Sequence, residues 1–319
     1  MSTVLVTSRS FSSGDLDLVA RLAEAGHDLV RGPADHDLAA LRDVLARADA
    51  WIAGTGPVAA AHLQAAPALQ VVARYGVGYD AVDLTAAAEA GVLVTNTPGA
   101  NSGAVADHAM ALILAILRRL ADGDRRVRRG DWSVTRGREL GALTVGIIGF
   151  GRIGQGVAQR LGGFGSEVVV HDPFLTDRAA ADLGVTTLDL PAIAAAADVV
   201  TLHAPGGEQI VDQDWLAHAN PGQIVVNTAR ADLVDESAIA QALRDGSLSG
   251  FAADTLATES AAGASPLLAE DLIDRVLITP HLGAQTVQAI DLMGSMAVDD
   301  VLAVLSGTTP SHQIDLKEN

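Results

Sequence analysis

The residues with the clearest chemical meaning are three glycines that follow a short apolar run. Gly149, Gly151 and Gly154 have the spacing G-x-G-x-x-G and come directly after the run 145–148. In such a turn the first glycine permits a tight bend, and the second lets the backbone approach a pyrophosphate. The third lets helix and strand pack closely. The free N–H groups and the positive dipole end of a following helix would also suit phosphate.

An acidic residue completes this pattern. A helical stretch after the glycines ends at Gly162 and Gly163, and a β-branched run, 167–171, leads to Asp172. An acid about 20 residues after the glycines is the expected partner for ribose hydroxyls. Glycines of this spacing also mark ordinary turns, but here strand, helix, second strand and acid are in register. The stretch therefore predicts a dinucleotide-binding site.

Side chains able to do further chemistry follow later apolar runs. Each has an ordinary explanation when taken alone, because Arg230 could form a surface ion pair, Glu259 could be solvated and His281 could be structural. Hydride transfer to a keto acid needs a cation near the carbonyl, a proton donor, and an acid that keeps the donor charged. Arg230, His281 and Glu259 have the types for these three tasks, and Asp254 precedes the loop that carries the glutamate.

Short β runs alternate with helical patterns along the whole chain, which predicts parallel sheets with helices on both faces. We expect strands at 4–6, 51–53, 70–73, 92–94, 145–148, 167–171, 198–202, 224–226, 249–253 and 276–278. Loops after the carboxyl ends of such strands are the default ligand positions.

Two long helical patterns, 101–120 and 284–305, suggest the domain boundaries. The length of 319 residues favours two domains. We expect a substrate domain from residues 1–99 and 284–319, with a dinucleotide-binding domain, 100–283, inserted into it.

Composition restricts the function further. The chain has 21 basic and 39 acidic residues, a net charge of -18, which disfavours binding to nucleic acid and to anionic membranes. Lys317 is its one lysine, so arginines must bind an anionic substrate. Without cysteine there is no thiolate nucleophile. The longest apolar run, 109–117, is too short to span a bilayer, and we expect a soluble cytoplasmic protein. An arginine cluster at 125–129 could bind phosphate, but a solvated face or a subunit contact is the favoured interpretation.

Several segments together resemble the D-isomer-specific 2-hydroxyacid dehydrogenase family, most nearly its D-3-phosphoglycerate-dehydrogenase-like branch. The resemblance covers nearly the whole chain and lies in 74–80 (RYGVGYD), 96–99 and 101–107, 149–154 with Asp172, 227–230 (NTAR), Asp254 with Glu259, and 279–284 (TPHLGA). It implies an α/β fold of two doubly wound parallel-sheet domains, with a Rossmann NAD-binding domain inserted in a flavodoxin-like substrate domain.

The resemblance also implies the members of the site. The catalytic residues would be Arg230, Glu259 and His281. The residues that bind NAD would be Gly149, Gly151, Arg152, Ile153, Gly154, Asp172, His203, Ala204, Thr228 and Asp254. The residues that bind substrate would be Arg74, Val77, Gly78, Arg230 and His281.

By this resemblance the reaction is a reversible hydride transfer between NAD(H) and C2 of a small anionic 2-hydroxy or 2-oxo acid, and it needs no metal. Arg230 would polarise the C2 oxygen, and the Val77 and Gly78 amides would help it hold the carboxylate. His281 would exchange the hydroxyl proton, while Glu259 would raise the pKa of that histidine and fix its tautomer.

Three departures from the family pattern bear on the substrate. The loop 206–208 is short where the family usually has a longer stretch with threonine, and 231–232 (AD) replace a usual glycine pair. Ala53 stands where phosphoglycerate dehydrogenases place an arginine for the substrate phosphate, which puts phosphoglycerate itself in doubt. Arg74 and Arg9 are expected near Arg230, so a second anionic group, phosphate or phosphonate, is our hypothesis; both could instead form surface ion pairs.

Two other functions stay open. One is a non-catalytic NAD(H)-sensing protein, because the same scaffold also serves as transcriptional corepressors. The other is a dehydrogenase for another small oxyanion, such as a hydroxyphosphonate, formate or phosphite. Glu259 argues against formate, since the formate enzymes have glutamine there. The family also suggests a homodimer through the dinucleotide domain, using 107–120 and 125–129.

Overall fold

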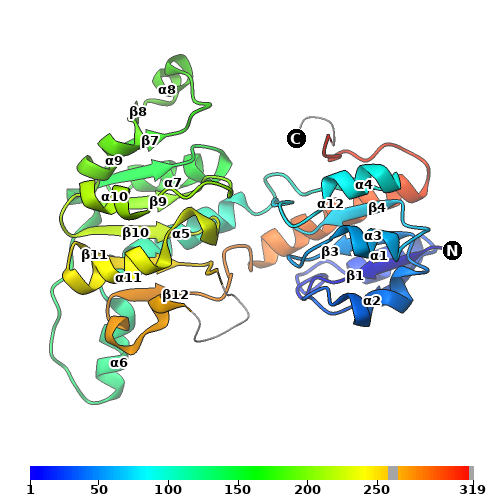
Figure 1. Ribbon diagram of the computed structural model, residues 1–319, viewed down its shortest axis with the longest axis horizontal. Coiled ribbons are helices and arrows are strands. Elements are labelled where there is room, and N and C mark those ends of the chain that lie inside the picture. The colour runs from blue at the N-terminus through cyan, green and yellow to red at the C-terminus, as the bar shows by residue number, and fades with distance from the viewer. Residues whose placement is uncertain (258–264, 316–319) are drawn as a thin grey trace. The chain divides into compact units, whose positions relative to one another are not determined.

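The computed structural model of the protein describes residues 1–257 and 265–315. The chain divides into two compact units, which we call the first unit (residues 1–101 and 284–319) and the second unit (residues 102–283). Each unit has its own sheet with helices on both faces (Figure 1).

The sheet of the first unit is entirely parallel, in the order β2-β1-β3-β4-β5. This is the flavodoxin-like order. Its strands are β1 (Thr3–Val6), β2 (Asp28–Arg31), β3 (Ala50–Ala53), β4 (Val71–Arg74) and β5 (Leu93–Thr95). Every residue of β3 and β4 is buried, as expected for central strands covered on both faces.

In the described part of this unit, the helices that cover the sheet are α1 (Leu18–Glu24), α2 (Leu38–Leu45), α3 (Ala60–Gln64), α4 (Leu84–Ala90) and α12 (Val287–Leu305). Asp17, Asp37 and Asp83 each begin a helix by accepting a hydrogen bond from a backbone N–H of its first turn. Although α12 comes from the other end of the chain, it packs against β3, β4 and α1 (Figure 1).

The second unit has a parallel sheet in the order β12-β11-β10-β9-β6-β7-β8. Its strands are β6 (Thr144–Ile148), β7 (Glu167–His171), β8 (Thr186–Thr187), β9 (Val199–Leu202), β10 (Gln223–Asn227), β11 (Leu248–Ala253) and β12 (Val276–Ile278). The first six in chain order have the Rossmann arrangement, and β12 adds one strand at the edge. The chain reverses direction across the sheet between β6 and β9, which is where such folds bind ligands.

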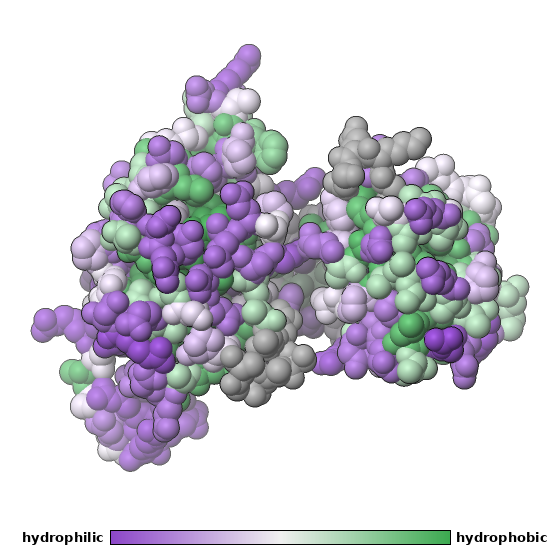
Figure 2. Space-filling model, viewed as in Figure 1, coloured by the Kyte–Doolittle hydropathy of each residue, from purple (hydrophilic) through white to green (hydrophobic). Residues whose placement is uncertain are grey.

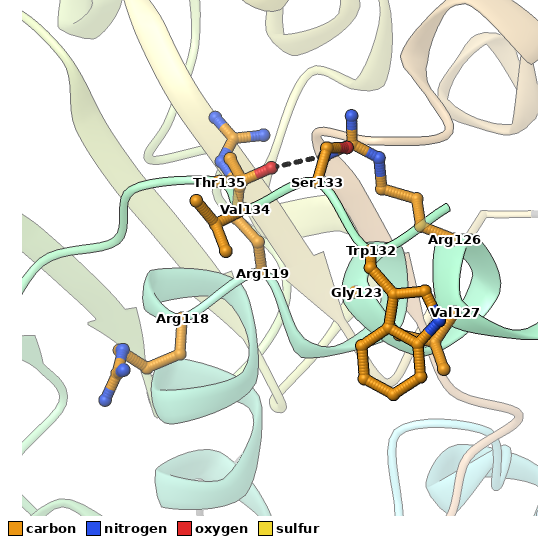
Figure 3. Close-up of a pocket in the computed structure, with 9 residues that line it drawn as sticks. All are labelled: Arg118, Arg119, Gly123, Arg126, Val127, Trp132, Ser133, Val134 and Thr135. Carbon is orange, nitrogen blue, oxygen red and sulfur yellow. Dashed lines mark hydrogen bonds between the residues drawn. The ribbon is translucent and has the colours of Figure 1, made fainter. Parts of the chain in front are cut away.

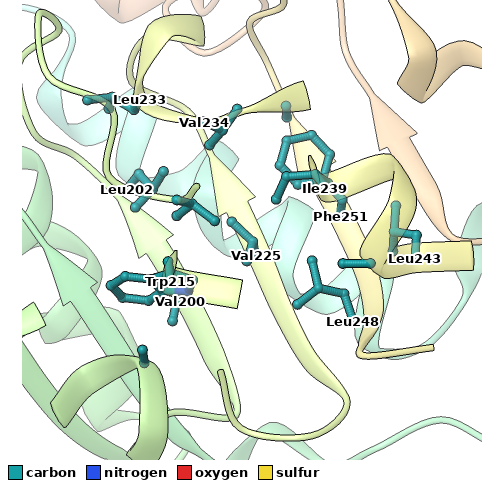
Figure 4. Packing of buried hydrophobic residues seen from close by; sticks show 14 of the residues in the cluster. Val200, Leu202, Trp215, Val225, Leu233, Val234, Ile239, Leu243, Leu248 and Phe251 are labelled. Carbon is teal, nitrogen blue, oxygen red and sulfur yellow. The ribbon is translucent and has the colours of Figure 1, made fainter. Parts of the chain in front are cut away.

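The helices of the second unit are α5 (Ser102–Leu117), α6 (Leu120–Arg128), α7 (Arg152–Gly162), α8 (Asp177–Leu183), α9 (Leu190–Ala196), α10 (Gln213–His218) and α11 (Glu236–Asp245). Short 3₁₀ turns lie at Leu140–Ala142, Ala231–Leu233, Pro266–Leu268 and Glu270–Leu272. One core packs α5 and α7 on the sheet. The other packs α9, α10 and α11 on it, with Trp215, Ile239 and Phe251 among its members (Figure 4).

The predicted fold class is confirmed, but the prediction of one helix over 101–120 is wrong. The helix α5 ends at Leu117, and Arg119 adopts a left-handed conformation (φ 50°) before α6 begins. The Leu117 carbonyl accepts a hydrogen bond from the Arg138 N–H, and the Arg119 guanidinium binds the Asp274 carbonyl. Contacts with distant segments therefore accompany the break, and no local glycine or proline marks it.

The strands β2 and β8 were not expected from the sequence. Both lie at edges of their sheets; β8 is exposed, and β2 is exposed at its two ends and half-buried in its middle. An edge strand needs no continuous apolar run, so these two leave little signal in the sequence. Within the described residues, no helix combines the length and the apolar character needed to cross a membrane.

Candidate active site

The glycine turn has the geometry that the sequence predicts. It joins β6 to α7, and Gly149 has a φ of +89° that L residues rarely adopt. A Cβ on Gly149 would lie 2.5 Å from the Ala204 nitrogen, and a Cβ on Gly154 would lie 2.2 Å from the Gly149 carbonyl oxygen. By contrast, apart from Gly151 itself and its chain neighbours, no heavy atom lies within 4 Å of the Cβ position of Gly151, the residue that caps α7. The turn is thus tightly packed at Gly149 and Gly154 and open at Gly151, at the start of the helix, where a pyrophosphate would lie.

Asp172 is fixed beside this turn. Its Oδ2 accepts a hydrogen bond from the Phe150 N–H (2.7 Å), and its Oδ1 accepts one from the Phe174 N–H (2.9 Å). A carboxylate has about four acceptor sites, so two backbone bonds leave capacity for ribose hydroxyls. Glycine turn, helix start and carboxylate together fit a dinucleotide.

The strand next to β6 supplies the opposite wall. His203 follows β9, and its backbone N–H binds the Ile148 carbonyl (2.7 Å). Its imidazole lies 3.0 Å from the Thr201 hydroxyl and 3.5 Å from that of Thr228. Burial holds the pKa of His203 well below its ordinary value, so the imidazole is neutral. His203 and Ala204 therefore lie against Gly149, and Thr228 lies beside His203; that these three residues bind NAD stays a prediction. Arg152 lies exposed in the first turn of α7, and Ile153 is half-buried behind it.

Arg230 lies on a turn that a buried asparagine holds in shape. The Asn227 side chain accepts from the Ala229 N–H (3.0 Å) and donates to the Arg230 carbonyl (2.7 Å). The Arg230 guanidinium donates to the Ala229 carbonyl (2.9 Å), and the side chain is half-buried. Asn227 belongs to the 227–230 segment that resembles the family, but it is not among the predicted site residues.

Two of the departures from the family pattern meet in the structure. The Asp232 carboxylate accepts a hydrogen bond from the Gly207 N–H (2.8 Å). A Cβ on Gly206 would lie 2.8 Å from the same carboxylate and 3.2 Å from Cγ of Arg230. The short loop after β9 is therefore fastened to the segment after β10, and a side chain at Gly206 would interfere with that contact.

Asp254, at the end of β11, organises the loop that carries His281. Its Oδ1 accepts from the Thr279 hydroxyl (2.5 Å) and the Leu282 N–H (2.8 Å), and its Oδ2 accepts from the Gly283 N–H (2.7 Å). The His281 N–H donates to the carbonyl of Asp254 (3.1 Å), and His281 has the positive φ of 56°. The imidazole of His281 is exposed.

His108 on α5 is a further partner of Asp254, and it was not predicted. Its Nε2 lies 3.2 Å from Oδ1 of Asp254 and 2.9 Å from Oγ1 of Thr279. Burial alone would raise the pKa of the Asp254 carboxyl, but the hydrogen bonds from His108, Thr279 and the two backbone amides outweigh it and hold the pKa below its usual range. The signal in the sequence was a lone histidine within the apolar helix. Glu259, the third predicted catalytic residue, lies outside the described residues.

In the first unit, Arg74 at the end of β4 is buried. Its guanidinium donates to the carbonyls of Gly56 (3.0 Å) and Gly78 (3.3 Å), so it ties the loop after β3 to the loop after β4. Val77, in that second loop, accepts from the Asn96 side chain (2.8 Å). Arg9 is exposed. Whether Arg74, Val77 and Gly78 bind substrate stays a prediction.

Comparison with known proteins identifies the family. Residues 110–283 match the description "D-isomer specific 2-hydroxyacid dehydrogenase, NAD binding domain". D-3-phosphoglycerate dehydrogenase of Mycobacterium tuberculosis is 42% identical over 250 residues, which are 77% of this chain and 47% of that protein. Glyoxylate reductase of Korarchaeum cryptofilum is 33% identical, over 82% of this chain and 80% of its own. The chain belongs to the D-isomer-specific 2-hydroxyacid dehydrogenase family.

Solved structures agree with this assignment. The TT0316 protein from Thermus thermophilus has a TM-score of 0.88 and 35% identity, over 98% of this chain and 99% of its own. D-2-hydroxyisocaproate dehydrogenase has a TM-score of 0.82 and 26% identity, over 98% and 99%. The predicted family and fold are therefore confirmed. NAD as the predicted cofactor is confirmed by the NAD-binding domain that the chain shares with the family.

This dehydrogenase-family chain spans about half the length of the Mycobacterium and Archaeoglobus D-3-phosphoglycerate dehydrogenases that it matches. Those proteins therefore do not fix its substrate. The described residues contain no cluster of three or more histidine, cysteine or acidic side chains that could hold a metal ion.

A surface cavity of about 290 Å³ lies apart from the residues predicted for the active site. It is lined by Arg118, Arg119, Gly123, Arg126, Val127, Trp132, Ser133, Val134 and Thr135 (Figure 3). The Arg126 guanidinium donates hydrogen bonds to the Thr135 hydroxyl (2.7 Å) and the Asp131 carboxylate (3.1 Å). Arg125 and Arg128 likewise pair with Asp274 and Asp124. The arginines of α6 thus lie in a network of solvated ion pairs, and Figure 2 shows a mainly hydrophilic surface there.

Proposed function

We propose that this chain is an NAD-dependent D-2-hydroxyacid dehydrogenase, which catalyses reversible hydride transfer at C2 of a small anionic 2-hydroxy or 2-oxo acid. The observation that carries the proposal is the arrangement at the carboxyl ends of the strands of one sheet. The glycine turn that suits a dinucleotide follows β6, and Arg230 follows β10. Asp254 follows β11, and its carboxylate fixes the loop that carries His281 after β12.

Each residue has a task in this reaction. Bound NAD(H) supplies or takes up the hydride. The Arg230 guanidinium stabilises negative charge on the C2 oxygen and on the substrate carboxylate, a role that suits its planar donor group. His281 donates the hydroxyl proton during reduction and accepts it during oxidation, and its imidazole is exposed to solvent. Glu259 would hold that imidazole charged and oriented.

Asp254 acts on this chemistry through the backbone. Its carboxylate accepts from Leu282 and Gly283, the two residues that follow His281, so it sets the place of the imidazole. His203 stays neutral and so adds no charge to the wall of the proposed cofactor site beside Gly149.

The substrate is proposed at the level of its chemical class. Relatives are named for phosphoglycerate and for glyoxylate, so both a phosphorylated and a plain 2-oxo acid are consistent with the family. A phospho- or phosphono-hydroxy acid remains our hypothesis for the natural substrate, with Val77, Gly78 and Arg74 as further ligands. Two donors of Arg74 already bind backbone carbonyls, so Arg74 would hold a second anion through its other guanidinium N–H groups.

The test is a panel of 2-oxo acids and their phosphate and phosphonate analogues, assayed with NADH by loss of its absorbance. Turnover of any 2-oxo acid supports the dehydrogenase. Binding of NADH without turnover of any member would instead support a sensor of NAD(H). If pyruvate, glyoxylate or hydroxypyruvate is reduced more efficiently than every phosphorylated or phosphonate analogue, the second-anion hypothesis is wrong.

We also propose that the protein is a homodimer that associates through the second unit. Support comes from large apolar side chains that lie exposed on α6 and after it, with 57% of Leu120, 78% of Trp132 and 95% of Val134 accessible. Sedimentation of the wild-type protein and of Trp132→Ser, which should shift toward monomer, would test this.

A cytoplasmic location remains part of the proposal, and fractionation of cells that express the protein would test it.

A further inference from the structure

His108 is a polar side chain on α5 that reaches Thr279 and Asp254, beside the loop of His281. The helix is apolar over most of its length, and a histidine there must find partners as the helix packs. It finds two, since Nε2 lies 2.9 Å from Oγ1 of Thr279 and 3.2 Å from Oδ1 of Asp254. Its contacts therefore lead to the predicted catalytic loop.

The hydrogen-bonding capacities of these three groups fix where the protons lie. The Thr279 hydroxyl has one proton, and it donates this proton to Oδ1 of Asp254 (2.5 Å). Thr279 can then only accept at its contact with His108, so Nε2 of His108 must carry a proton. The ionised Asp254 carboxylate also only accepts, which requires the same proton. His108 is thus a donor to both partners.

The Asp254 carboxylate that accepts these hydrogen bonds holds a strained loop. The two carboxylate oxygens accept hydrogen bonds from the Leu282 and Gly283 amides. The backbone carbonyl of Asp254 accepts one from the His281 N–H. His281 has a φ of 56°, a conformation that costs a residue with a side chain free energy and persists only where its surroundings enforce it. Gly283 lies so close that a Cβ there would come within 3.1 Å of Oδ2 of Asp254.

We propose that His108 is a positioning residue of the active site, which acts through Thr279 and Asp254 to hold the loop of His281 in its working conformation. The inference rests on the dehydrogenase function proposed above for the role of His281. His108 itself touches neither substrate nor cofactor in this proposal.

Two substitutions separate positioning from bulk packing. His108→Leu keeps an apolar volume on α5 but removes the donor, whereas the amide nitrogen of His108→Gln extends about as far as Nε2 and can donate in its place. We expect kcat to fall about tenfold or more in His108→Leu, the scale of a lost hydrogen bond to a charged group, and to stay near wild type in His108→Gln. KM for NADH should change little in either variant.

The pH profile gives a readout that packing alone would not move. The titratable side chain of His108 on α5 contacts the Asp254 carboxylate, and His281 and Arg230 lie on neighbouring loops. Removing its donor raises the pKa of Asp254, so the carboxylate that holds the loop is lost at a higher pH on acidification. The acid limb of the kcat profile should therefore move to higher pH in His108→Leu and stay in place in His108→Gln.

A second readout does not depend on activity. Amide hydrogen exchange of Leu282 and Gly283 in the enzyme without ligands should be faster in His108→Leu than in wild type, and again restored in His108→Gln. His218→Leu, which removes an exposed histidine of α10, is the matched control and should change neither exchange nor turnover. If His108→Leu fails to fold, Thr279→Val must produce the same two effects.

Wild-type turnover and wild-type exchange in His108→Leu would overturn the proposal. The proposal would also be overturned if turnover and exchange in His108→Gln were as impaired as in His108→Leu, because the hydrogen-bond donor at position 108 would then not be what holds the loop. If the wild-type enzyme turns over no 2-oxo acid, the dehydrogenase proposal fails while the exchange experiment still decides whether His108 holds the loop.

Discussion

At Asp172, the fixed position of one carboxylate sets a preference between cofactors. Hydrogen bonds from Phe150 and Phe174 prevent the carboxylate from turning away from a bound ribose, so a 2′-phosphate would meet a negative charge that cannot move. The neighbouring His171 directs Nδ1 to the Leu188 carbonyl (3.0 Å). We expect kcat/KM to favour NADH over NADPH by about tenfold or more, or roughly 1.4 kcal/mol.

Comparison of kcat/KM for the two cofactors measures this preference directly. Asp172→Ser should lower the ratio of kcat/KM with NADH to kcat/KM with NADPH, because it removes the negative charge while keeping an acceptor for one backbone N–H. Asp177→Asn, an exposed change in the first turn of α8, is the control and should leave the ratio unchanged. Equal efficiency with both cofactors in the wild type would contradict the role given to Asp172.

The conformation of His281 decides how its chemistry should be tested. At a φ of 56°, alanine would add backbone strain to the loss of the imidazole, whereas asparagine tolerates this conformation. We therefore expect His281→Asn to lower kcat by roughly 100-fold or more with little change in NADH affinity, the usual scale for a lost general acid or base. Stopped-flow turnover and NADH fluorescence titration measure the two quantities, and a variant with unchanged kcat would remove His281 from the mechanism.

Among the structural elements, the short loop after β9 depends on the segment after β10. The bond from the Gly207 N–H to Asp232 fastens a loop whose first residues, His203 and Ala204, pack against Gly149. Asp232→Ala should weaken NADH binding by roughly three- to tenfold, the scale of one hydrogen bond to a charged group at a partly exposed site. Asp232→Asn can still accept through its side-chain oxygen and should bind nearly as the wild type does, as fluorescence titration would show. Equal affinities for all three proteins would mean that this contact does not shape the cofactor site.

The elements also show how far the sequence could be interpreted. The glycine turn and Asp172 were predictable because all their requirements lie within one short stretch: backbone freedom, a helix start and an acid at the next strand end. The end of α5 at Leu117 was not predictable, because its carbonyl bonds to Arg138. The same holds for the contact between Gly207 and Asp232, which appeared in the sequence as two unrelated departures. Pairings between distant segments carry no local pattern.

For the molecule as a whole, buried histidines predict sensitivity to acid. In the first unit, His36 is 2% exposed, with Nδ1 donating to the Pro57 carbonyl (2.9 Å). Its Nε2 accepts from the Thr7 hydroxyl (2.7 Å), because the oxygen of Thr7 already accepts from Trp51 and Gly54. A proton on Nε2 would therefore have no acceptor. Burial, reinforced by the nearby charge of Arg74, lowers the pKa of His36 to about 4.

The direction of the effect follows from proton linkage. Because the folded-state pKa of His36 lies below its unfolded value, the unfolded chain binds the extra proton first as the pH falls. The first unit should thus keep its full stability above about pH 6.5 and lose on the order of 2 to 3 kcal/mol of it by about pH 4. Urea unfolding followed by tryptophan fluorescence measures this stability in the double variant Trp132→Phe, Trp215→Phe. In that protein Trp51 is the one tryptophan left, and its ring centroid lies 5.0 Å from that of His36. His36→Asn in the same background tolerates the positive φ of 59° and does not titrate, so its free energy of unfolding should depend less on pH across this window. An identical pH dependence in the two proteins would show that other groups govern the acid response.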